Sequence, residues 1–159
     1  MQESEARLFG FRSEFQACVA ELIGRTRYAL AISDHDLSDW SLEQSGAVAQ
    51  LERILLAPQA AVRILVRDTE FLEKHAPRLL ALRKRHAAAL SIRQVPASIA
   101  SDEGLMLGDT THVLRRAHHD AFRGRVQFAM PAEAEPWRRK FDASWAESQE
   151  CLAATTLGL

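Results

Sequence analysis

The sequence is short of several features that mark specialised classes of protein. It has only two cysteines in 159 residues, Cys18 and Cys151, so a framework of disulfides is not expected, and both are predicted to lie on helical faces. It contains no uninterrupted apolar run of the about 18 residues that a membrane-spanning helix needs. The stretch 1–15 is charged and lacks a signal-peptide core. These absences predict a cytoplasmic protein without a membrane span.

The composition is that of an ordinary globular chain. Hydrophobic residues make up 47% of the sequence and charged residues 26%. The length suits one domain, predicted to span residues 1–159, and there is no internal repeat, low-complexity segment or linker. The composition therefore excludes disordered and multidomain classes but does not indicate an activity.

The net charge of −1 hides two regions of opposite sign. Residues 1–60 carry 5 basic and 9 acidic side chains, whereas residues 112–140 carry seven basic and three acidic ones. Such asymmetry can mark a site for an anion or for nucleic acid. An ordinary solvated surface of mixed charge explains it equally simply, so the basic region alone does not assign a ligand.

The first half of the chain predicts a parallel β-α-β unit. Residues 12–24 have apolar side chains at helical spacing, and residues 28–33 and 61–66 are apolar runs of strand length. Between these runs, residues 48–55 predict a second helix that ends before Pro58. Two buried strands joined by a helix of this length form a parallel crossover.

The second half predicts a further helix and strand, then a hairpin, a last strand and a closing helix. We expect these elements at residues 77–89, 90–95, 104–109 with 112–116, 125–130 and from Pro136 onward. The fold class is therefore α/β, with a mixed, mostly parallel sheet flanked by helices in a sandwich.

Two stretches carry a resemblance to a known family. The first is "YALAISDHDLSDWSLEQSGAVAQLERILLAPQAAVRILVRD", and the second is the hairpin "DEGLMLGDTTHVLRR", followed by a late strand and a helix containing "FDASWAES". In this order and spacing the chain resembles one half of the phospholipase D superfamily. It looks most like single-copy bacterial domains of that fold, some of which are joined to an acyltransferase domain. The resemblance therefore implies the phospholipase D-like fold and makes an acyltransferase a candidate partner.

The catalytic motif of that family is altered in this chain. The motif is a histidine, a lysine two residues later and an aspartate five residues beyond the lysine. If Asp109 is the aspartate, Asp102 occupies the histidine position and Gly104 the lysine position, and "AHHDAFRG" replaces the family's Gly-Ser-x-Asn stretch. The family uses the histidine as nucleophile and the lysine to stabilise charge on phosphorus. A carboxylate at 102 would repel a phosphodiester, so the usual activity is not expected.

Two classes of function stay open. The first is a non-catalytic binding or interaction module with a degenerate site, in which a basic cleft holds an anionic small molecule or nucleic acid. No catalytic residue or cofactor is assigned in this hypothesis. Its candidate ligand-binding residues are Asp109, Arg115, Arg116, Arg123, Arg125, His35 and His118.

The second class is a hydrolase or transferase that uses a non-standard site, and its candidate residues are His35, His112, His118 and His119, which would have to meet Asp109 in one cleft. Whether the protein is an enzyme stays open, although the missing histidine and lysine favour the first class.

The basic residues near the hairpin can be placed by strand geometry. Arg115 and Arg116 are adjacent on a strand and must point to opposite faces, whereas Arg123 and Arg125 share a face. Guanidinium groups bind phosphate oxygens in paired hydrogen bonds, which suits anion capture. The alternative is that these arginines pair with acidic neighbours and bind nothing; the neighbours considered are Asp120, Glu133 and Glu135.

A metal site is not expected from the pattern "HHD" at 118–120. Adjacent residues on an extended chain point in opposite directions, so His118 and His119 would not bind one ion together. No cysteine or further carboxylate falls at a spacing that identifies zinc or iron.

The resemblance also implies a homodimer. Two half-units of the family pack around a pseudo-two-fold axis, and a single-copy chain can reproduce this by self-association.

Overall fold

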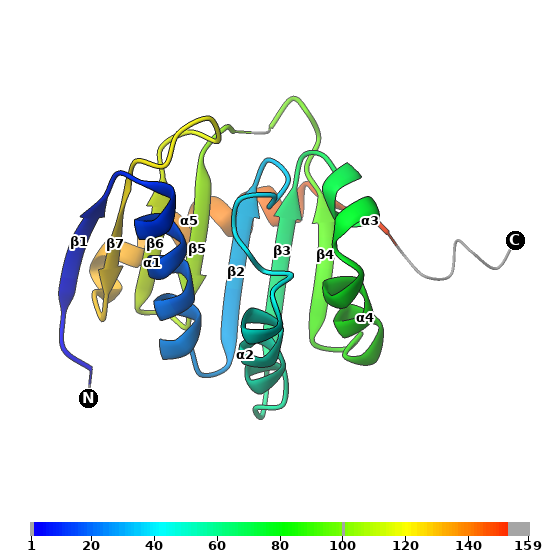
Figure 1. Cartoon of the computed structure of the whole chain (residues 1–159), viewed down its shortest axis with the longest axis horizontal. Helices are drawn as coiled ribbons and strands as arrows, with labels where there is room; N and C mark the ends of the chain where they lie inside the picture. The colour runs from blue at the N-terminus through cyan, green and yellow to red at the C-terminus, as the bar shows by residue number, and fades with distance from the viewer. Residues whose placement is uncertain (1, 100, 153–159) are drawn as a thin grey trace, which may run out of the picture.

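The computed structural model describes residues 2–99 and 101–152, which form one mixed sheet with helices on both faces (Figure 1). The helices and strands in chain order are β1 Glu5–Phe9, α1 Arg12–Arg25, β2 Ala29–Asp34, α2 Ser45–Leu55, β3 Ala61–Val66, α3 Glu70–His75, α4 Pro77–Arg85, β4 Leu90–Gln94, β5 Gly104–Gly108, β6 His112–Arg116, β7 Gly124–Phe128, α5 Pro131–Ala146 and β8 Gln149–Glu150. Within these residues the sheet has eight strands in the order β1-β7-β6-β5-β2-β3-β4-β8.

The sheet is mixed, as predicted, but it is not mostly parallel. Strand β3 pairs in parallel with β2 and with β4, and the other strand pairs among the described residues are antiparallel. The connections explain this difference. A helix carries the chain back along the sheet before β3 and before β4, whereas no helix lies in the loop before β5 or in the turns on either side of β6. Connections without a crossover reverse the strand direction.

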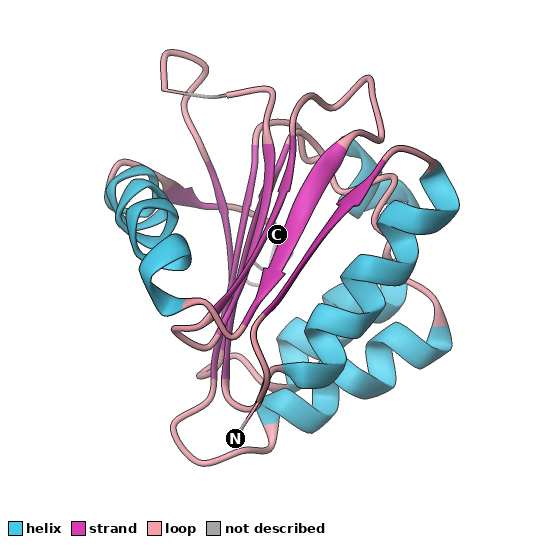
Figure 2. Ribbon diagram, turned by 90° about the vertical axis from the view of Figure 1, so that its left-hand side faces the viewer, coloured by secondary structure: helices cyan, strands magenta, loops and turns pink. Residues whose placement is uncertain are grey.

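Two hydrophobic layers hold the helices against the sheet. Helices α1 to α4 cover one face and α5 covers the other, and the side view separates the two layers (Figure 2). Helix α1 buries one stripe of its surface, because its apolar residues recur every three or four positions. These residues are Phe15, Cys18, Val19, Leu22 and Ile23. On the opposite face Phe141 and Ala134 of α5 pack on a smaller cluster that includes Leu65 and Leu105.

Several element boundaries differ from the predicted ones. The fourth helix ends at Arg85 instead of continuing to residue 89, and α5 begins at Pro131, with Pro136 inside the helix. Strands β1 and β8 and helix α3 were not predicted. Cys18 is a buried free thiol on α1, as expected, but Cys151 follows β8 and does not lie on a helix.

Among the described residues, no helix has both the length and the apolar character needed to cross a membrane.

Candidate functional site

Three histidines and an aspartate gather at one end of the sheet. The parallel strands β2 and β3 end there, and the loops that precede β5 and follow β6 meet them at the same edge, at the top of Figure 1. His35 follows β2, Asp102 precedes β5, and His118 and His119 follow β6. We call these four residues the histidine cluster. It includes Asp102, the residue set against the family's catalytic histidine if Asp109 is the aspartate of the motif.

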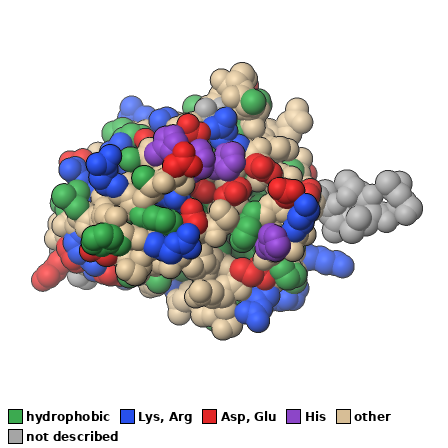
Figure 3. All heavy atoms as spheres, turned by 45° about the horizontal axis from the view of Figure 1, so that its top comes forward, with side chains coloured by type: hydrophobic (Ala, Val, Ile, Leu, Met, Phe, Trp, Pro, Cys, Tyr) green, Lys and Arg blue, Asp and Glu red, His purple; other side chains and the backbone are tan. Residues whose placement is uncertain are grey.

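The members of the cluster are in close contact. The ring of His119 stacks on the rings of both His35 and His118, with centroid separations of 4.7 Å and 4.9 Å. Asp102 Oδ2 lies 3.2 Å from His118 Nε2, and Asp102 Oδ1 lies 3.6 Å from His119 Nδ1. The space-filling view shows histidines grouped with acidic and basic side chains on this face (Figure 3). Contact with solvent makes the group accessible to a ligand.

The expectation that His118 and His119 point to opposite faces is wrong. Residues 117–123 form turns and irregular structure instead of a strand, so the two rings lie on the same side. Asp120 completes the turn: its carboxylate lies 3.1 Å from His119 Nε2 and 3.5 Å from His118 Nδ1. Each ring therefore has one nitrogen near Asp102 and the other near Asp120.

A network of charged side chains, which we call the buried charge network, holds the loops that carry the histidine cluster; its members are Arg116, Asp39 and Asp34. The Arg116 side chain is 1% exposed, and its guanidinium lies 3.0 Å from Asp39 Oδ2. The same group donates hydrogen bonds to the backbone carbonyls of His119 and Ala121, so it fixes the loop that carries the histidines. Arg116 is therefore a positioning residue for His119.

Asp34 is the other buried member of this network. Its Oδ2 accepts hydrogen bonds from the backbone N–H groups of Asp36 and Leu37. Burial raises the pKa of the Asp34 carboxyl, even though these N–H groups and the Arg116 guanidinium favour its charged form. Asp34 therefore shapes the loop after β2, on which His35 lies.

There is no space for a side chain at the position of the family's lysine. A Cβ atom placed on Gly104 would lie 2.9 Å from Trp40 Cζ2, 3.1 Å from Asp34 Oδ1 and 3.3 Å from Arg116 Cβ. Trp40 is buried, so its ring cannot move without repacking the core. The volume that a lysine would need is already occupied by this tryptophan and the buried charge network.

Asp109 lies at the other end of β5, in the hairpin turn. Its carboxylate accepts hydrogen bonds from the backbone N–H groups of Arg27, Tyr28 and Ala29, at 3.1–3.3 Å. Its φ of 52° is in the left-handed region, which aspartate tolerates better than most residues. The structure therefore places Asp109 in hydrogen bonds that hold the hairpin turn to the start of β2 and does not bring it together with the histidine cluster.

His112 is also separated from the cluster. It is buried at the start of β6, and its Nδ1 accepts a hydrogen bond of 2.9 Å from the backbone N–H of Ala129. Burial lowers the pKa of His112. Of the candidate histidines, the structure brings together His35, His118 and His119.

Arg115 and Arg116 point to opposite faces of the sheet, as strand geometry predicts. Arg116 faces α1, whereas Arg115 lies on the α5 face, with its guanidinium 3.7 Å from the centre of the Trp137 ring. Arg115 pairs in register with Arg125. Arg123 and Arg125 are exposed, and no carboxylate among the described residues pairs with either. Arg115 and Arg116 do have acidic partners, although these are Glu103 and Asp39 instead of the expected Asp120, Glu133 or Glu135.

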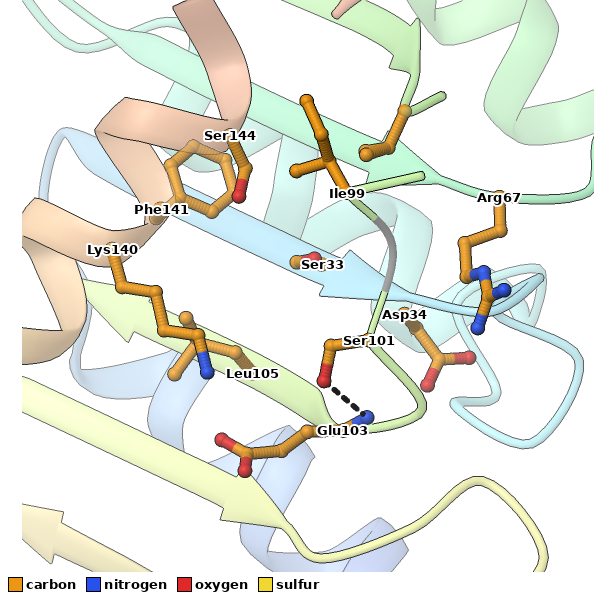
Figure 4. A pocket seen from close by; sticks show the side chains of 11 residues that line it. Ser33, Asp34, Arg67, Ile99, Ser101, Glu103, Leu105, Lys140, Phe141 and Ser144 are labelled. Atoms are coloured by element: carbon orange, nitrogen blue, oxygen red, sulfur yellow. Dashed lines mark hydrogen bonds between the residues drawn. The ribbon is translucent and has the colours of Figure 1, made fainter. Parts of the chain in front are cut away.

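A cavity lies beside the cluster, between the sheet and α5. Figure 4 shows Lys140 and Glu103 pointing into it from one side, and Arg67 and Asp34 from the other. Arg67 links this cavity to the cluster, because its guanidinium also lies 2.8 Å from Asp102 Oδ1. Arg67 and Lys140 were not singled out from the sequence. The rule that ligands bind beyond the carboxyl ends of parallel strands would have indicated Arg67, which directly follows β3.

Comparison with known proteins identifies the family and the fold. Residues 12–157 match a family described as a domain of unknown function, DUF7931. No match was found among curated protein sequences.

The structural neighbours are phospholipase D-like. Nuc from Salmonella typhimurium, a phospholipase D family member, superposes with a TM-score of 0.66 at 13% identity, covering 95% of this chain and 100% of Nuc. NucT from Helicobacter pylori gives a TM-score of 0.63 at 9% identity, covering 94% of this chain and 100% of NucT. TrmBL2, an archaeal chromatin protein described as having a novel mode of DNA binding, gives 0.69 at 12% identity, covering 92% of this chain and 54% of TrmBL2. This chain thus spans about half of TrmBL2 and has the phospholipase D-like fold.

Proposed function

The chain belongs to the DUF7931 family, and we propose that it is a binding domain of phospholipase D-like fold that does not cleave phosphodiesters by the usual mechanism. The packing around Gly104 carries this proposal. Trp40, Asp34 and Arg116 surround the position at which the family's lysine would stabilise the charge on phosphorus. Asp102 supports it further, because a carboxylate paired with Arg67 occupies the position of the nucleophilic histidine.

A phosphodiesterase assay tests this proposal. The purified full chain is incubated with bis(4-nitrophenyl) phosphate, and the release of nitrophenol is compared with that from a heat-denatured sample. We expect no turnover above background. Turnover that persists in a His118→Ala, His119→Ala double variant and is lost in Asp102→Asn would overturn the proposal.

We propose that the ligand is anionic and binds on the α5 face beside β7. Arg125 lies on this face as the cross-strand neighbour of Arg115, and Arg123 directly precedes β7; both are exposed without an acidic partner among the described residues. Trp137 lies under Arg115 and holds its guanidinium in place on this face. The neighbour TrmBL2 is described as binding DNA, which makes a nucleic acid a reasonable first probe.

Binding is measured with a short single-stranded DNA and with inorganic phosphate, each across a series of salt concentrations. Electrostatic binding weakens steeply as the salt concentration rises. We expect an Arg123→Ala, Arg125→Ala double variant to lose DNA binding, and the Arg53→Ala variant to serve as a matched control, since Arg53 bonds to backbone carbonyls near the end of α1. Absence of binding to both probes at low salt would eliminate the anionic ligand.

A second candidate function is a hydrolase or transferase that uses the histidine cluster. The observation in its favour is the meeting of His35, His118 and His119 with Asp102. The phosphodiesterase assay separates the two functions, since turnover that is lost in the His118→Ala, His119→Ala double variant supports the second.

We further propose that the protein is a single-domain homodimer of the bacterial cytoplasm and that an acyltransferase is a partner. Two free thiols fit a reducing compartment. The match to the full length of Nuc supports a single-copy unit. Light scattering at micromolar concentration tests the dimer, and a monomer mass would contradict it.

A further inference from the structure

We infer that Asp102, His118 and His119 form a binding site for one divalent transition-metal ion of the zinc type. This inference goes beyond the proposed function, because neither the altered motif nor the basic face requires a metal. One ligand atom from each of these three residues lies within 4.8 Å of the other two. The three residues come from two loops at the same end of the sheet, so the fold, and not proximity in sequence, brings Asp102 to the histidines.

The donor set determines the class of ion. Two imidazole nitrogens and one carboxylate oxygen suit zinc and related transition metals, whereas Mg²⁺ and Ca²⁺ prefer oxygen ligands only. Bonds of about 2.0–2.1 Å in a tetrahedral site place neighbouring donor atoms roughly 3.3 Å apart. The separations are 3.2 Å from His118 Nε2 to Asp102 Oδ2 and 3.6 Å from His119 Nδ1 to Asp102 Oδ1, so each histidine faces its own carboxylate oxygen at close to this spacing. To bind one ion, the three ligand atoms, which lie within 4.8 Å of one another, must draw closer around it.

The second nitrogen of His119 already has the environment that a metal-binding histidine needs. Such histidines usually present their other ring nitrogen to a carboxylate, which fixes the ring and raises its basicity. Here the Asp120 carboxylate lies 3.1 Å from His119 Nε2, whereas His118 Nδ1 accepts a hydrogen bond of 3.2 Å from the backbone N–H of Asp120. Asp120 therefore orients His119 through its carboxylate and His118 through its backbone.

The surrounding contacts also hold the ligands in place. His35 stacks on His119, Arg116 bonds to the backbone carbonyl of His119, and Arg67 pairs with Asp102. The Nδ1 atom of His119 is buried and has no hydrogen-bond partner, so it is available as a ligand atom facing Asp102. Three protein ligands leave a fourth position for water or for an anionic group.

Metal binding to the full chain tests the site. The untagged protein is treated with a chelator, dialysed against buffer containing excess Mg²⁺, and titrated with Zn²⁺ in a calorimeter; the zinc retained is then measured by mass spectrometry. We expect one zinc ion per chain. Replacement of its bound Zn²⁺ with Co²⁺ should give the visible absorption of a tetrahedral site.

Variants separate the cluster from adventitious binding. We expect His118→Ala and His119→Ala each to weaken zinc binding by more than about 100-fold, and Asp120→Asn by about 10-fold, as loss of an outer-shell partner does. His75→Ala is the matched control, because His75 is exposed on α3 outside the cluster, and it should bind zinc like the original chain.

Circular dichroism checks that each variant is folded. Asp102→Asn, which preserves shape, replaces any histidine variant that is not folded. Absence of retained zinc, or equal affinity in the histidine variants and the original chain, would overturn the inference. Neither result would bear on the phosphodiesterase or DNA-binding tests.

Discussion

The two ends of the β5–β6 hairpin differ in how their residues compare with the phospholipase D motif. At the turn, Asp109 stands where the family motif has its aspartate and bonds to three backbone N–H groups at the start of β2. At the other end, an aspartate and a glycine stand at the positions of the histidine and the lysine, and Trp40 fills the space beside the glycine. The difference shows that the aspartate at the turn has structural hydrogen bonds of its own, whereas the packing around Gly104 leaves no space for a longer side chain.

The largest effect is expected from restoring the lysine. In Gly104→Lys the new side chain would collide with Trp40 and place an ammonium group beside a buried network, so we expect a loss of more than about 3 kcal/mol in unfolding free energy. Urea denaturation measures it. Gly104→Ala, which adds only the Cβ, should lose about 1–3 kcal/mol. A stable Gly104→Lys variant would show that the space is not filled as described.

At the turn, Asp109→Ala should cost about 2–3 kcal/mol. The substitution leaves three N–H groups without their charged acceptor and puts alanine at a φ of 52°. Urea denaturation again gives the change. Asp109→Asn, which keeps an acceptor oxygen and tolerates this φ, should lose less. Equal losses in the two variants would mean that the negative charge stabilises the turn and that a neutral acceptor oxygen and tolerance of this φ contribute little.

A smaller effect, on the pH dependence of stability, is expected from His112, which is buried at the turn end of the hairpin, unlike the accessible histidines at the other end. Burial lowers the pKa of His112, so the unfolded chain takes up a proton on this residue at a higher pH than the folded chain does. Stability attributable to His112 should therefore be constant above about pH 6.5 and fall as the pH drops below it. Unfolding is followed from pH 8 to pH 5, because this range spans the ordinary histidine pKa of about 6.5.

The His112→Asn variant isolates this contribution. Its side-chain oxygen can still accept the N–H of Ala129, but it does not titrate. The difference in unfolding free energy between the original chain and this variant should change with pH. If the difference in unfolding free energy stayed constant from pH 8 to pH 5, His112 would not be the source of the pH dependence.

The smallest effect is expected at Asp102. Its carboxylate is exposed to solvent and pairs with the partly exposed Arg67, so Asp102→Ala should change the unfolding free energy by less than about 1 kcal/mol. The same urea experiment measures it. A loss as large as that of Asp109→Ala would show that both ends of the hairpin serve stability equally.

The regular parts of the fold follow from local patterns in the sequence. The apolar run at 61–66 coincides with β3, and the hairpin strands fall within a residue of their predicted bounds, because buried strands are read directly from apolar runs. The half-exposed strand β1 has no such run, since its conformation depends on pairing with the distant β7. Helix α3 is too short for a period to be recognised.

The candidate site is less accessible to sequence reasoning. The hydrogen bonds of Asp109 reach residues 27–29, which are far upstream, and no local pattern in the sequence predicts such a contact. The sequence indicated His35, His118 and His119 as candidates, but not that a turn after β6 aligns the last two rings. Asp102 was noted for the histidine it replaces, whereas its position against both histidines required the fold.

The pairing of β1 with β7 has a consequence for how the protein is made. Residues 5–9 leave the ribosome early, but their partners are residues 124–128, at the other end of the chain. At about 5–20 residues per second, the nascent β1 waits roughly 6–24 s for its neighbour in the sheet. The β2–β3–β4 unit can assemble during that time, because its contacts are close in sequence. Glu5 and Arg7, the charged residues of the waiting strand, discourage its pairing with nascent chains on neighbouring ribosomes.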